Sequence, residues 1–306
     1  MPLSHNSRGA LFMAVAMAGF TISDAITKHL SEAMNIGQIM AVRGVFATLL
    51  VGLLAWQRGA LSRPSAVLHP MVALRVAGEA LATLTYFIAL SHLPIANVSA
   101  VQQALPLAVT MGAALFFGEY VGPRRWLAIT AGLVGVLIIV RPGFEGFSAY
   151  SLLVLLCVML CAMRDLATKQ VPNAIPTLLI SAATSVAVTS VGAAIVQPMG
   201  GWTPLTLEEV LLLVVGAVLL LIGYQFIIMA MRIGDISFIA PFRYTALLWA
   251  IVIGVIVFGD FPDAPMIVGA SIIIGSGLYT LYRERVVGRG KAAAESTGPA
   301  MAPDGI

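Results

Sequence analysis

Two acid–base pairs with the spacing of one helical turn lie in otherwise apolar stretches of the sequence. Asp24 and Lys28 occur in SDAITKHL, and Asp165 and Lys169 occur in RDLATKQV. Residues four apart share a helix face, and an acid that precedes a base is the favoured order. A charge within a bilayer is costly unless it is paired or hydrated. We therefore predict that these residues act in gating or ion coupling, or form structural ion pairs at helix ends, where a lysine can reach the membrane surface.

A third acid, Glu79, lies one helical turn after Arg75 in another apolar run, and Tyr86 continues roughly the same stripe. A carboxylate in such a low-dielectric position can carry a proton through a conformational cycle. The alternative is an internal ion pair with Arg75 or Arg43 that holds two helices together. Glu79 is therefore a candidate for ion coupling, with a proton as the coupled ion.

Two pairs of polar residues border prolines within apolar runs. Gln102 and Gln103 precede the proline of VQQALP, and Arg243 and Tyr244 follow the proline of APFRYT. Proline frees backbone carbonyls, which can serve a cavity, and a fixed guanidinium can clamp a carboxylate or stack on an aromatic ring. Hydrogen bonding between helices is the alternative role for such glutamines. The complete set of predicted substrate-binding residues is Gln102, Gln103, Arg243, Tyr244, Arg43, Tyr86, Tyr224 and Gln225.

The composition indicates where these polar residues must lie. Hydrophobic residues make up 59% of the 306 residues and charged residues only 10%, whereas soluble domains carry about 25% charge. Such a chain cannot form a water-facing surface of ordinary polarity, so we predict an all-α integral membrane protein. A spanning helix needs about 20 mostly apolar residues. The segments that qualify are 9–29, 37–56, 70–90, 96–117, 124–141, 149–169, 177–197, 208–231, 237–258 and 265–282.

The distribution of basic residues predicts the orientation of these ten segments. Lys and Arg gather in cytoplasmic loops and helix ends. With a cytoplasmic N-terminus, the outer side keeps only Lys28 and Arg141. The inner side then holds Arg8, Arg58, Arg63, Arg124, Arg125, Lys169, Arg232, Arg283, Arg285, Arg289 and Lys291. We therefore expect both termini in the cytoplasm and a location in the bacterial inner (plasma) membrane.

The sequence also contains an internal repeat. DAITK at 24–28 recurs as DLATK at 165–169, and FFGE at 116–119 is matched by VFGD at 257–260, both with an offset of 141 residues. A constant offset predicts duplication of a five-helix unit. Because five is odd, the second copy must be inverted, an arrangement that places binding sites near the midplane around a central cavity between the halves. The expected units are a first repeat at 1–148, a second repeat at 149–285 and a disordered cytoplasmic tail at 286–306.

Each half begins with an Asp/Lys-bearing helix and closes with GE or GD before a Gly-rich helix. The closing segments read GEYVGPRRWLAITAGLVGVLIIVRP and GDFPDAPMIVGASIIIGSGLY. Over residues 9–285 the chain thereby resembles the EamA-type branch of the drug/metabolite transporter superfamily. The resemblance implies a central cavity lined by helices 1, 3, 4, 6, 8 and 9, with helices 5 and 10 more peripheral. Relatives that take up S-adenosylmethionine or riboflavin similarly combine an Asp-x-x-x-Lys with an arginine on helix 2, here Arg43.

The preferred function is therefore a secondary transporter that moves a small organic metabolite by alternating access. The excess of bases over acids in the spans favours a substrate with a carboxylate, a phosphate or polarised carbonyls, such as riboflavin, S-adenosylmethionine or an aromatic amino acid. The alternative is a membrane-embedded lipid- or isoprenoid-processing enzyme or a lipid scramblase. We expect no enzyme, because no phosphate-binding loop or metal-ligand spacing occurs and the four histidines fall near loops or helix ends.

The remaining expectations concern partners. No cofactor and no metal are expected, and a net charge of +3 is too small to suggest nucleic acid. Cys157 and Cys161 lie one helical turn apart in an apolar run, where we expect small core residues, because a metal site would need more ligands nearby. The expected partners are a small-molecule substrate and membrane lipid. The Gly/Ala-rich runs ITAGLVGVL and GASIIIGSGL should allow close helix packing and leave room for a homodimer.

Overall fold

The computed structural model describes residues 5–62, 64–144, 147–172, 174–233 and 236–287, and these residues fold into helices joined by short connections. Within these ranges, ten helices are long and apolar enough to cross a membrane, as the sequence predicts. From residue 288 onward, the expected tail lies outside the described residues, together with the basic residues Arg289 and Lys291 that were assigned to the inner side.

The first half of the chain contributes five of the ten spans. They are α1 (His5–Leu30), α2 (Ile36–Gln57), α3 (Pro70–His92), α4 (Ile95–Gln102) continued by α5 (Leu105–Phe117), and α6 (Pro123–Val140), with the short helices η1 (Ala60–Ser62) and η2 (Pro64–Leu68) between α2 and α3. The other spans are α7 (Tyr150–Lys169), α8 (Thr177–Val196), α9 (Leu207–Ile233), the composite of η3 (Ala240–Tyr244), α11 (Thr245–Ile253) and η4 (Gly254–Phe258), and α12 (Ala264–Val287); α10 (Ile236–Ile239) precedes η3.

Two of the spans are irregular at their prolines, as the sequence predicts. The fourth span breaks between α4 and α5, where Pro106 stands in the first turn of α5. The ninth span opens with the 3₁₀ turn η3, which contains Pro241. Proline has no N–H to donate and clashes with the preceding helical turn, so a regular α-helix cannot run through these positions. Both irregular segments lie beside the cavity described below.

The repeated FFGE and VFGD motifs fold in the same way. Each helix ends at a glycine in the left-handed conformation, Gly118 with φ 65° and Gly259 with φ 69°. In both turns the amide of the next residue donates to the carbonyl six residues before it, at 3.3 Å and 2.9 Å. A side chain with a Cβ is disfavoured at these angles, which accounts for glycine at both positions. The repeat in the sequence is thus also a repeat in local backbone structure.

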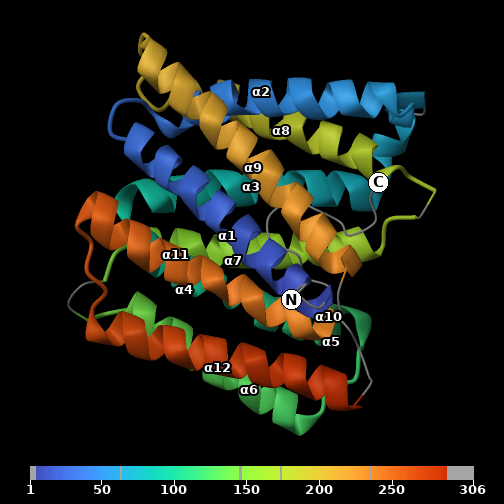
Figure 1. Ribbon diagram of the computed structural model, residues 1–306, viewed down its shortest axis with the longest axis vertical. Helices are drawn as coiled ribbons and strands as arrows, with labels where there is room; N and C mark the ends of the chain where they lie inside the picture. Colours follow the sequence, from blue (N-terminus) through green and yellow to red (C-terminus); the bar gives the residue numbers. More distant parts are fainter. Residues whose placement is uncertain (1–4, 63, 145–146, 173, 234–235, 288–306) are drawn as a thin grey trace.

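The helices pack in pairs that join the two halves of the chain (Figure 1). α1 packs mainly against α9, α2 against α8, α3 against α7 and α6 against α12. Figure 1 shows α2 and α8 along one edge of the molecule, α6 and α12 along the opposite edge, and the other spans between them. The middle group therefore contains the irregular spans and the Asp/Lys-bearing helices α1 and α7.

Glycines bring α6 and α12 into close contact, as expected for the Gly-rich runs. A Cβ added to Gly269 would lie 2.5 Å from the carbonyl oxygen of Gly135, and one added to Gly135 would lie 2.7 Å from the carbonyl oxygen of Gly269. Such distances leave no room for a side chain. Close backbone approach of this kind stabilises helix pairs in membranes, where burial from water provides no driving force.

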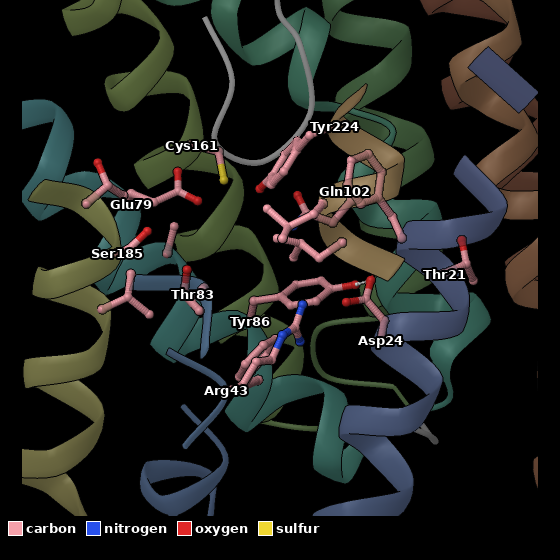
Figure 2. Close-up of a pocket in the computed structure, with 18 of the residues that line it drawn as sticks. Thr21, Asp24, Arg43, Glu79, Thr83, Tyr86, Gln102, Cys161, Ser185 and Tyr224 are labelled. Atoms are coloured by element: carbon pink, nitrogen blue, oxygen red, sulfur yellow. Dashed lines mark hydrogen bonds between the residues drawn. The ribbon is translucent and has the colours of Figure 1, made fainter. Parts of the chain in front are cut away.

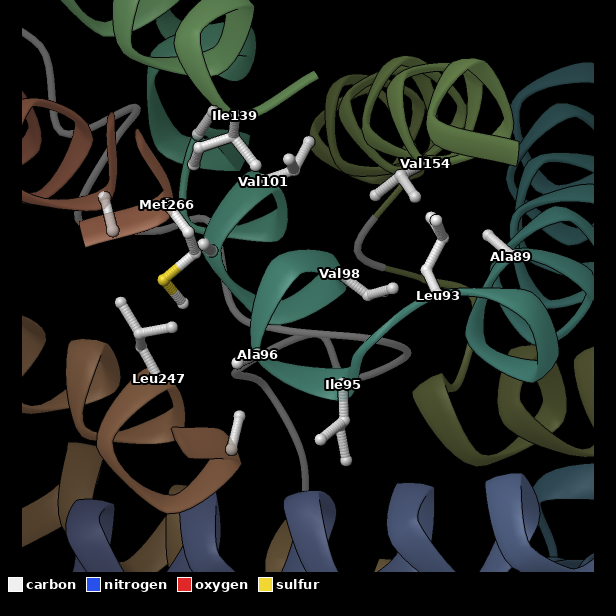
Figure 3. Close-up of a cluster of buried hydrophobic side chains, with 14 of the residues drawn as sticks. Ala89, Leu93, Ile95, Ala96, Val98, Val101, Ile139, Val154, Leu247 and Met266 are labelled. Atoms are coloured by element: carbon white, nitrogen blue, oxygen red, sulfur yellow. The ribbon is translucent and has the colours of Figure 1, made fainter. Parts of the chain in front are cut away.

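The largest cluster of buried apolar side chains surrounds the turn from α3 into α4 (Figure 3). Leu93 and Val98 of this turn meet Val154 from α7, and Met266 of α12 and Leu247 of α11 close the other side. This cluster packs α4 of the broken fourth span against helices from the first and the second half of the chain. The packing therefore fixes the position of α4 beside the cavity.

Candidate functional site

A cavity of about 310 Å³ lies in the middle group of helices (Figure 2). Side chains from α1, α3, α4, α5, α7, α9, η3 and α11 line it, and none of the lining residues comes from α6 or α12, the fifth and tenth spans, as the resemblance implies. The expected lining was incomplete, because α2 and α8, the second and seventh spans, also form a wall. Nine predicted site residues line the cavity: Asp24, Arg43, Glu79, Tyr86, Gln102, Gln103, Tyr224, Gln225 and Arg243.

Asp24 on α1 and Tyr86 on α3 meet in the lining of the cavity (Figure 2). The Tyr86 hydroxyl donates a hydrogen bond of 2.8 Å to Asp24 Oδ2. A hydrogen bond to an ionised acceptor is shorter and stronger than one between neutral groups. The phenol therefore holds the orientation of the acid at the edge of the cavity.

Arg43 extends from α2 toward the same region and is only 8% exposed. Its Nη1 donates to Thr27 Oγ1 at 2.8 Å, and the Thr27 hydroxyl donates to the carbonyl of Ser23 at 3.0 Å. The guanidinium carbon lies 5.4 Å from the centre of the Phe87 ring, within cation–π range. Arg43 is thus a buried cation in the cavity wall, held by a hydroxyl and an aromatic face.

Three charged residues form a second polar cluster between α3 and α7. Arg164 Nη1 lies 2.6 Å from Glu79 Oε2, and Arg164 Nε donates to Asp165 Oδ1 at 2.8 Å. The side chains of Arg164 and Glu79 are 2% and 7% exposed, and that of Asp165 is 13% exposed. Glu79 lines the cavity, whereas Arg164 and Asp165 are not among the lining residues. The cluster therefore connects the cavity to the Asp/Lys-bearing helix of the second half.

Glu79 has a partner that the sequence did not indicate. The sequence suggested Arg75 or Arg43, and the structure adds Arg164 from the other half of the chain. Arg75 is 2% exposed and donates from Nη1 to Thr184 Oγ1 of α8 at 3.0 Å. Packing of α3 on α7 brings Arg164 to Glu79, a contact between helices that are distant in sequence.

The two lysines of the repeated motif do not line the cavity. Lys28 Nζ donates to the carbonyls of Leu90 and Leu93 at 3.1 Å and 2.7 Å, and it lies 5.4 Å from the centre of the Phe258 ring. Carbonyls at a helix C-terminus lack intrahelical partners, so a lysine there caps α3. Lys169 is exposed in the last turn of α7. The acids of the two motifs have partners on other residues, Tyr86 for Asp24 and Arg164 for Asp165.

The broken fourth span presents its two glutamines to the cavity. Gln102 Nε2 donates to Cys157 Sγ of α7 at 3.3 Å. The equivalent break in the ninth span presents Arg243 but not Tyr244. Tyr244 is 7% exposed, and its hydroxyl lies against Gly277 of α12. Tyr244 is not among the residues that line the cavity, and its contact with substrate stays a prediction.

Aromatic rings complete the lining on the side of α9. The Tyr224 ring meets the Phe20 ring edge to face, with centroids 5.1 Å apart. Gln225 and Thr21 stand beside them in the lining. Rings in this arrangement offer apolar faces and polar edges for a flat ligand.

Two residues of this site, Arg164 and Thr184, are not among the residues predicted from the sequence. Arg164 directly precedes Asp165 within the apolar segment 149–169, so a bridging role for this cation could have been inferred. Thr184, which holds Arg75, carries no sequence signal beyond being a polar residue in a span. Within the described residues, no group of three or more His, Cys, Asp or Glu side chains could hold a metal ion.

Comparison with known proteins identifies the family to which this architecture belongs. The model of the EamA-like transporter family matches residues 7–141. The pseudopaline exporter of Pseudomonas aeruginosa is 30% identical over 275 residues, which cover 87% of this chain and 93% of the exporter. The chain belongs to the EamA-like transporter family. This EamA-type protein of the drug/metabolite transporter superfamily is therefore a small-molecule secondary transporter and a multi-pass membrane protein, and it is not an enzyme.

Other relatives of this EamA-like protein transport different molecules. A riboflavin transporter of Brucella anthropi is 33% identical over 71% of this chain and 77% of its own length. An S-adenosylmethionine uptake transporter of Rickettsia prowazekii is 25% identical over 90% of this chain and 93% of its own. The fold also matches that of a protein in a crystal structure, with a TM-score of 0.60 and 19% sequence identity. The match covers 92% of this chain and 99% of that protein chain.

Proposed function

We propose that this transporter carries a small, flat organic metabolite with a carboxylate or polarised carbonyl groups across the bacterial inner membrane. The observation that supports this is the pairing of Arg43 with Phe87 in a cavity that also presents Asp24, Tyr86 and Tyr224. A planar guanidinium recognises carboxylates and carbonyls, and aromatic walls bind flat rings. Riboflavin, S-adenosylmethionine and aromatic amino acids are the proposed substrates.

The size of the cavity is consistent with such a substrate. Ligand pockets usually enclose about 300–1,000 Å³. At about 310 Å³ the cavity lies at the lower end of this range, which favours a small metabolite over a long lipid. The amides of Gln102 and Gln103 add donors and acceptors to the lining. Polar groups of this kind select among molecules of similar shape.

The mechanism proposed is alternating access between two inverted repeats, residues 1–148 and 149–285. The packing supports this interpretation, because exchanging the halves converts the α1–α9 pair into the α7–α3 pair and leaves the α2–α8 and α6–α12 pairs unchanged. Thr48 of α2 and Thr189 of α8, which share a contact of 3.2 Å between hydroxyl oxygens, are separated by 141 residues, the offset of the repeat. Both termini would then be cytoplasmic.

Within this mechanism, the two Asp/Lys motifs belong to gates on opposite sides of the membrane. Lys28 ties the end of α1 to the end of α3. Arg164, which also binds Asp165 beside it on α7, ties α7 to Glu79 of α3. If the Lys28 contacts break while the Arg164 contacts stay intact, or the reverse, the cavity would open to one side of the membrane at a time. Charge reversal at Asp24 and at Asp165 should therefore impair opposite access states, which cysteine accessibility from each side of the membrane would measure.

Proton coupling is proposed for Glu79. It lines the cavity and is paired with a buried arginine, so its charge state affects both the substrate space and the contact between α3 and α7. Protonation of Glu79 would remove its attraction to Arg164 and loosen that contact. Proton movement down its gradient would then be linked to the conformational change.

The decisive experiment is a substrate screen in purified proteoliposomes with imposed pH and sodium gradients. Riboflavin, S-adenosylmethionine, phenylalanine and tryptophan are compared as radiolabelled substrates, and Arg43→Gln is the matched variant. We expect uptake of at least one of these compounds, with a clear loss of apparent affinity in Arg43→Gln. Absence of uptake for all four, or an affinity that Arg43→Gln leaves unchanged, would refute the proposed recognition.

A further inference from the structure

We propose that Cys157 and Cys161 form a dithiol site in the wall of the cavity that binds a thiophilic element, with trivalent arsenic as the defining ligand. The two sulfur atoms lie 4.0 Å apart on successive turns of α7. Both residues line the same cavity as Asp24 and Arg43. The two cysteines are the only ones in the sequence, and neither is in a disulfide.

The spacing of the thiols suits a ligand that bonds to two sulfurs at once. Metal–sulfur bonds of about 2.3 Å separate two sulfurs on one centre by a distance similar to the 4.0 Å seen here. Because both thiols are carried by one helix face, chelation needs only small side-chain rotations. Soft thiolates prefer soft elements, whereas a tetrahedral zinc site needs two further ligands. The absence of a three-residue metal-binding group among the described residues argues against zinc and leaves two-sulfur chelation.

The surroundings hold the two thiols at the edge of the cavity. The Gln102 amide donates to Cys157 Sγ at 3.3 Å, so that sulfur already serves as a hydrogen-bond acceptor. Ala82 and Leu105 pack beside the two thiols and give the pair an apolar environment. Figure 2 shows the Cys161 sulfur directed toward the space around which Glu79 and Tyr224 are arranged.

Phenylarsine oxide is a suitable probe because it forms cyclic adducts with paired thiols. Two S–H bonds and the arsenic–oxygen bond break, two arsenic–sulfur bonds form, and the oxygen leaves with both protons as water. Arsenic remains trivalent and sulfur is not oxidised, so no further reactant is needed. In another protein, an engineered cavity of about 150 Å³ binds benzene. The cavity here, at about 310 Å³, therefore has room for the phenyl group.

Intact-mass spectrometry of the purified protein tests the site independently of any transport substrate. The folded protein is treated with phenylarsine oxide and then washed with glutathione, a monothiol that removes singly bonded arsenic. We expect one retained phenylarsenic group per chain, released by ethanedithiol. In Cys157→Ala and Cys161→Ala, the adduct should dissociate about 10²-fold faster, the order of gain that a second tethered bond provides.

Two controls make the result decisive. Thermal unfolding in detergent checks that each alanine variant is folded. If one of them is not folded, the serine variant at the same position, Cys157→Ser or Cys161→Ser, is used instead. No adduct in the wild-type protein, or equal retention in the wild-type and single variants, would overturn the proposal. Because the mass measurement requires no transport, a failure of the proposed substrate recognition would leave this result unaffected.

Discussion

Glu79 on α3 and Arg164 on α7 are joined by an ion pair of 2.6 Å that connects the two halves of the chain beside the cavity. Both side chains are almost fully buried, and Asp165 shares the same guanidinium. A buried charge whose partner is removed is strongly destabilising, whereas an apolar replacement of the whole set can be tolerated. The pair is thus a structural joint, and under the proposed proton coupling a proton on Glu79 would change the contact between the halves.

Replacement of Arg164 by leucine should therefore destabilise the protein. The change removes the Arg164 cation from Glu79 and Asp165, which stay buried, and loss of one partner of a buried pair costs about 3–5 kcal/mol. Thermal unfolding in detergent measures the loss. The triple variant Arg164→Leu, Glu79→Gln and Asp165→Asn removes the unpaired charges and should recover most of the stability. If the single variant melts like the wild-type protein, the pair does not hold the halves together.

Replacement of Glu79 by glutamine separates coupling from substrate binding. The amide keeps the shape of the side chain but cannot release a proton, and Arg164 keeps Asp165 as a partner. We expect pH-driven accumulation in proteoliposomes to disappear while substrate counterflow continues. Asp24→Asn is the comparison, since it alters another cavity acid without touching the α3–α7 ion pair. Unaltered pH dependence in Glu79→Gln would rule out Glu79 as the proton carrier.

Removal of the Tyr86 hydroxyl should weaken the hold on Asp24. Tyr86→Phe deletes the donor of the 2.8 Å bond, and a hydrogen bond to a charged group contributes about 1.5–3 kcal/mol. We expect lower stability and a higher KM for the transported substrate. Tyr150→Phe is the matched control, because that ring stacks on His92, does not line the cavity and should keep its contact. Equal effects of the two changes would indicate that the bond to Asp24 has no special role.

Much of the fold was predictable because membranes impose simple constraints. Long apolar segments, the positions of Gly118 and Gly259, and the proline breaks are local properties that the sequence displays directly. The partners of the charged residues were not predictable in the same way. Asp24 and Lys28 share a helix face, yet each is held by α3, through Tyr86 and through the terminal carbonyls. Which helix supplies a partner depends on packing between segments distant in sequence, which no local spacing encodes.

The ion pair between Arg141 and Asp263 gives the link between α6 and α12 a pH dependence. Burial alone raises the pKa of Asp263, but hydrogen bonds from Arg141 and the Met266 amide outweigh it and hold that pKa below its usual value of 3.8. An acid whose pKa is lower in the folded than in the unfolded state stabilises the protein at pH values above its unfolded-state pKa. This contribution is lost as the pH falls through the folded-state pKa.

The effect should be small, because the Asp263 side chain is 51% exposed and water screens the pair. We expect the Tm in detergent to fall between about pH 6 and about pH 3, and to fall less in Arg141→Gln than in the wild-type protein. Asp260→Asn is the control, since it removes a neighbouring acid of the same loop and leaves the pair in place. An identical pH dependence in Arg141→Gln and wild type would show that the pair does not contribute.

A single methyl group should distinguish the tight contact between α6 and α12 from an ordinary helix surface. In Gly269→Ala the new Cβ would lie 2.5 Å from the Gly135 carbonyl, and backbone cannot yield as a flexible side chain does. The helices must separate, so we expect a loss of about 1–3 kcal/mol, the usual range for overpacking. Gly275→Ala on the same helix meets nothing within 4 Å and gains up to about 1 kcal/mol of helix propensity. The Tm in detergent should therefore fall in Gly269→Ala and rise in Gly275→Ala. A Tm shift of the same sign in both variants would exclude close backbone contact at Gly269.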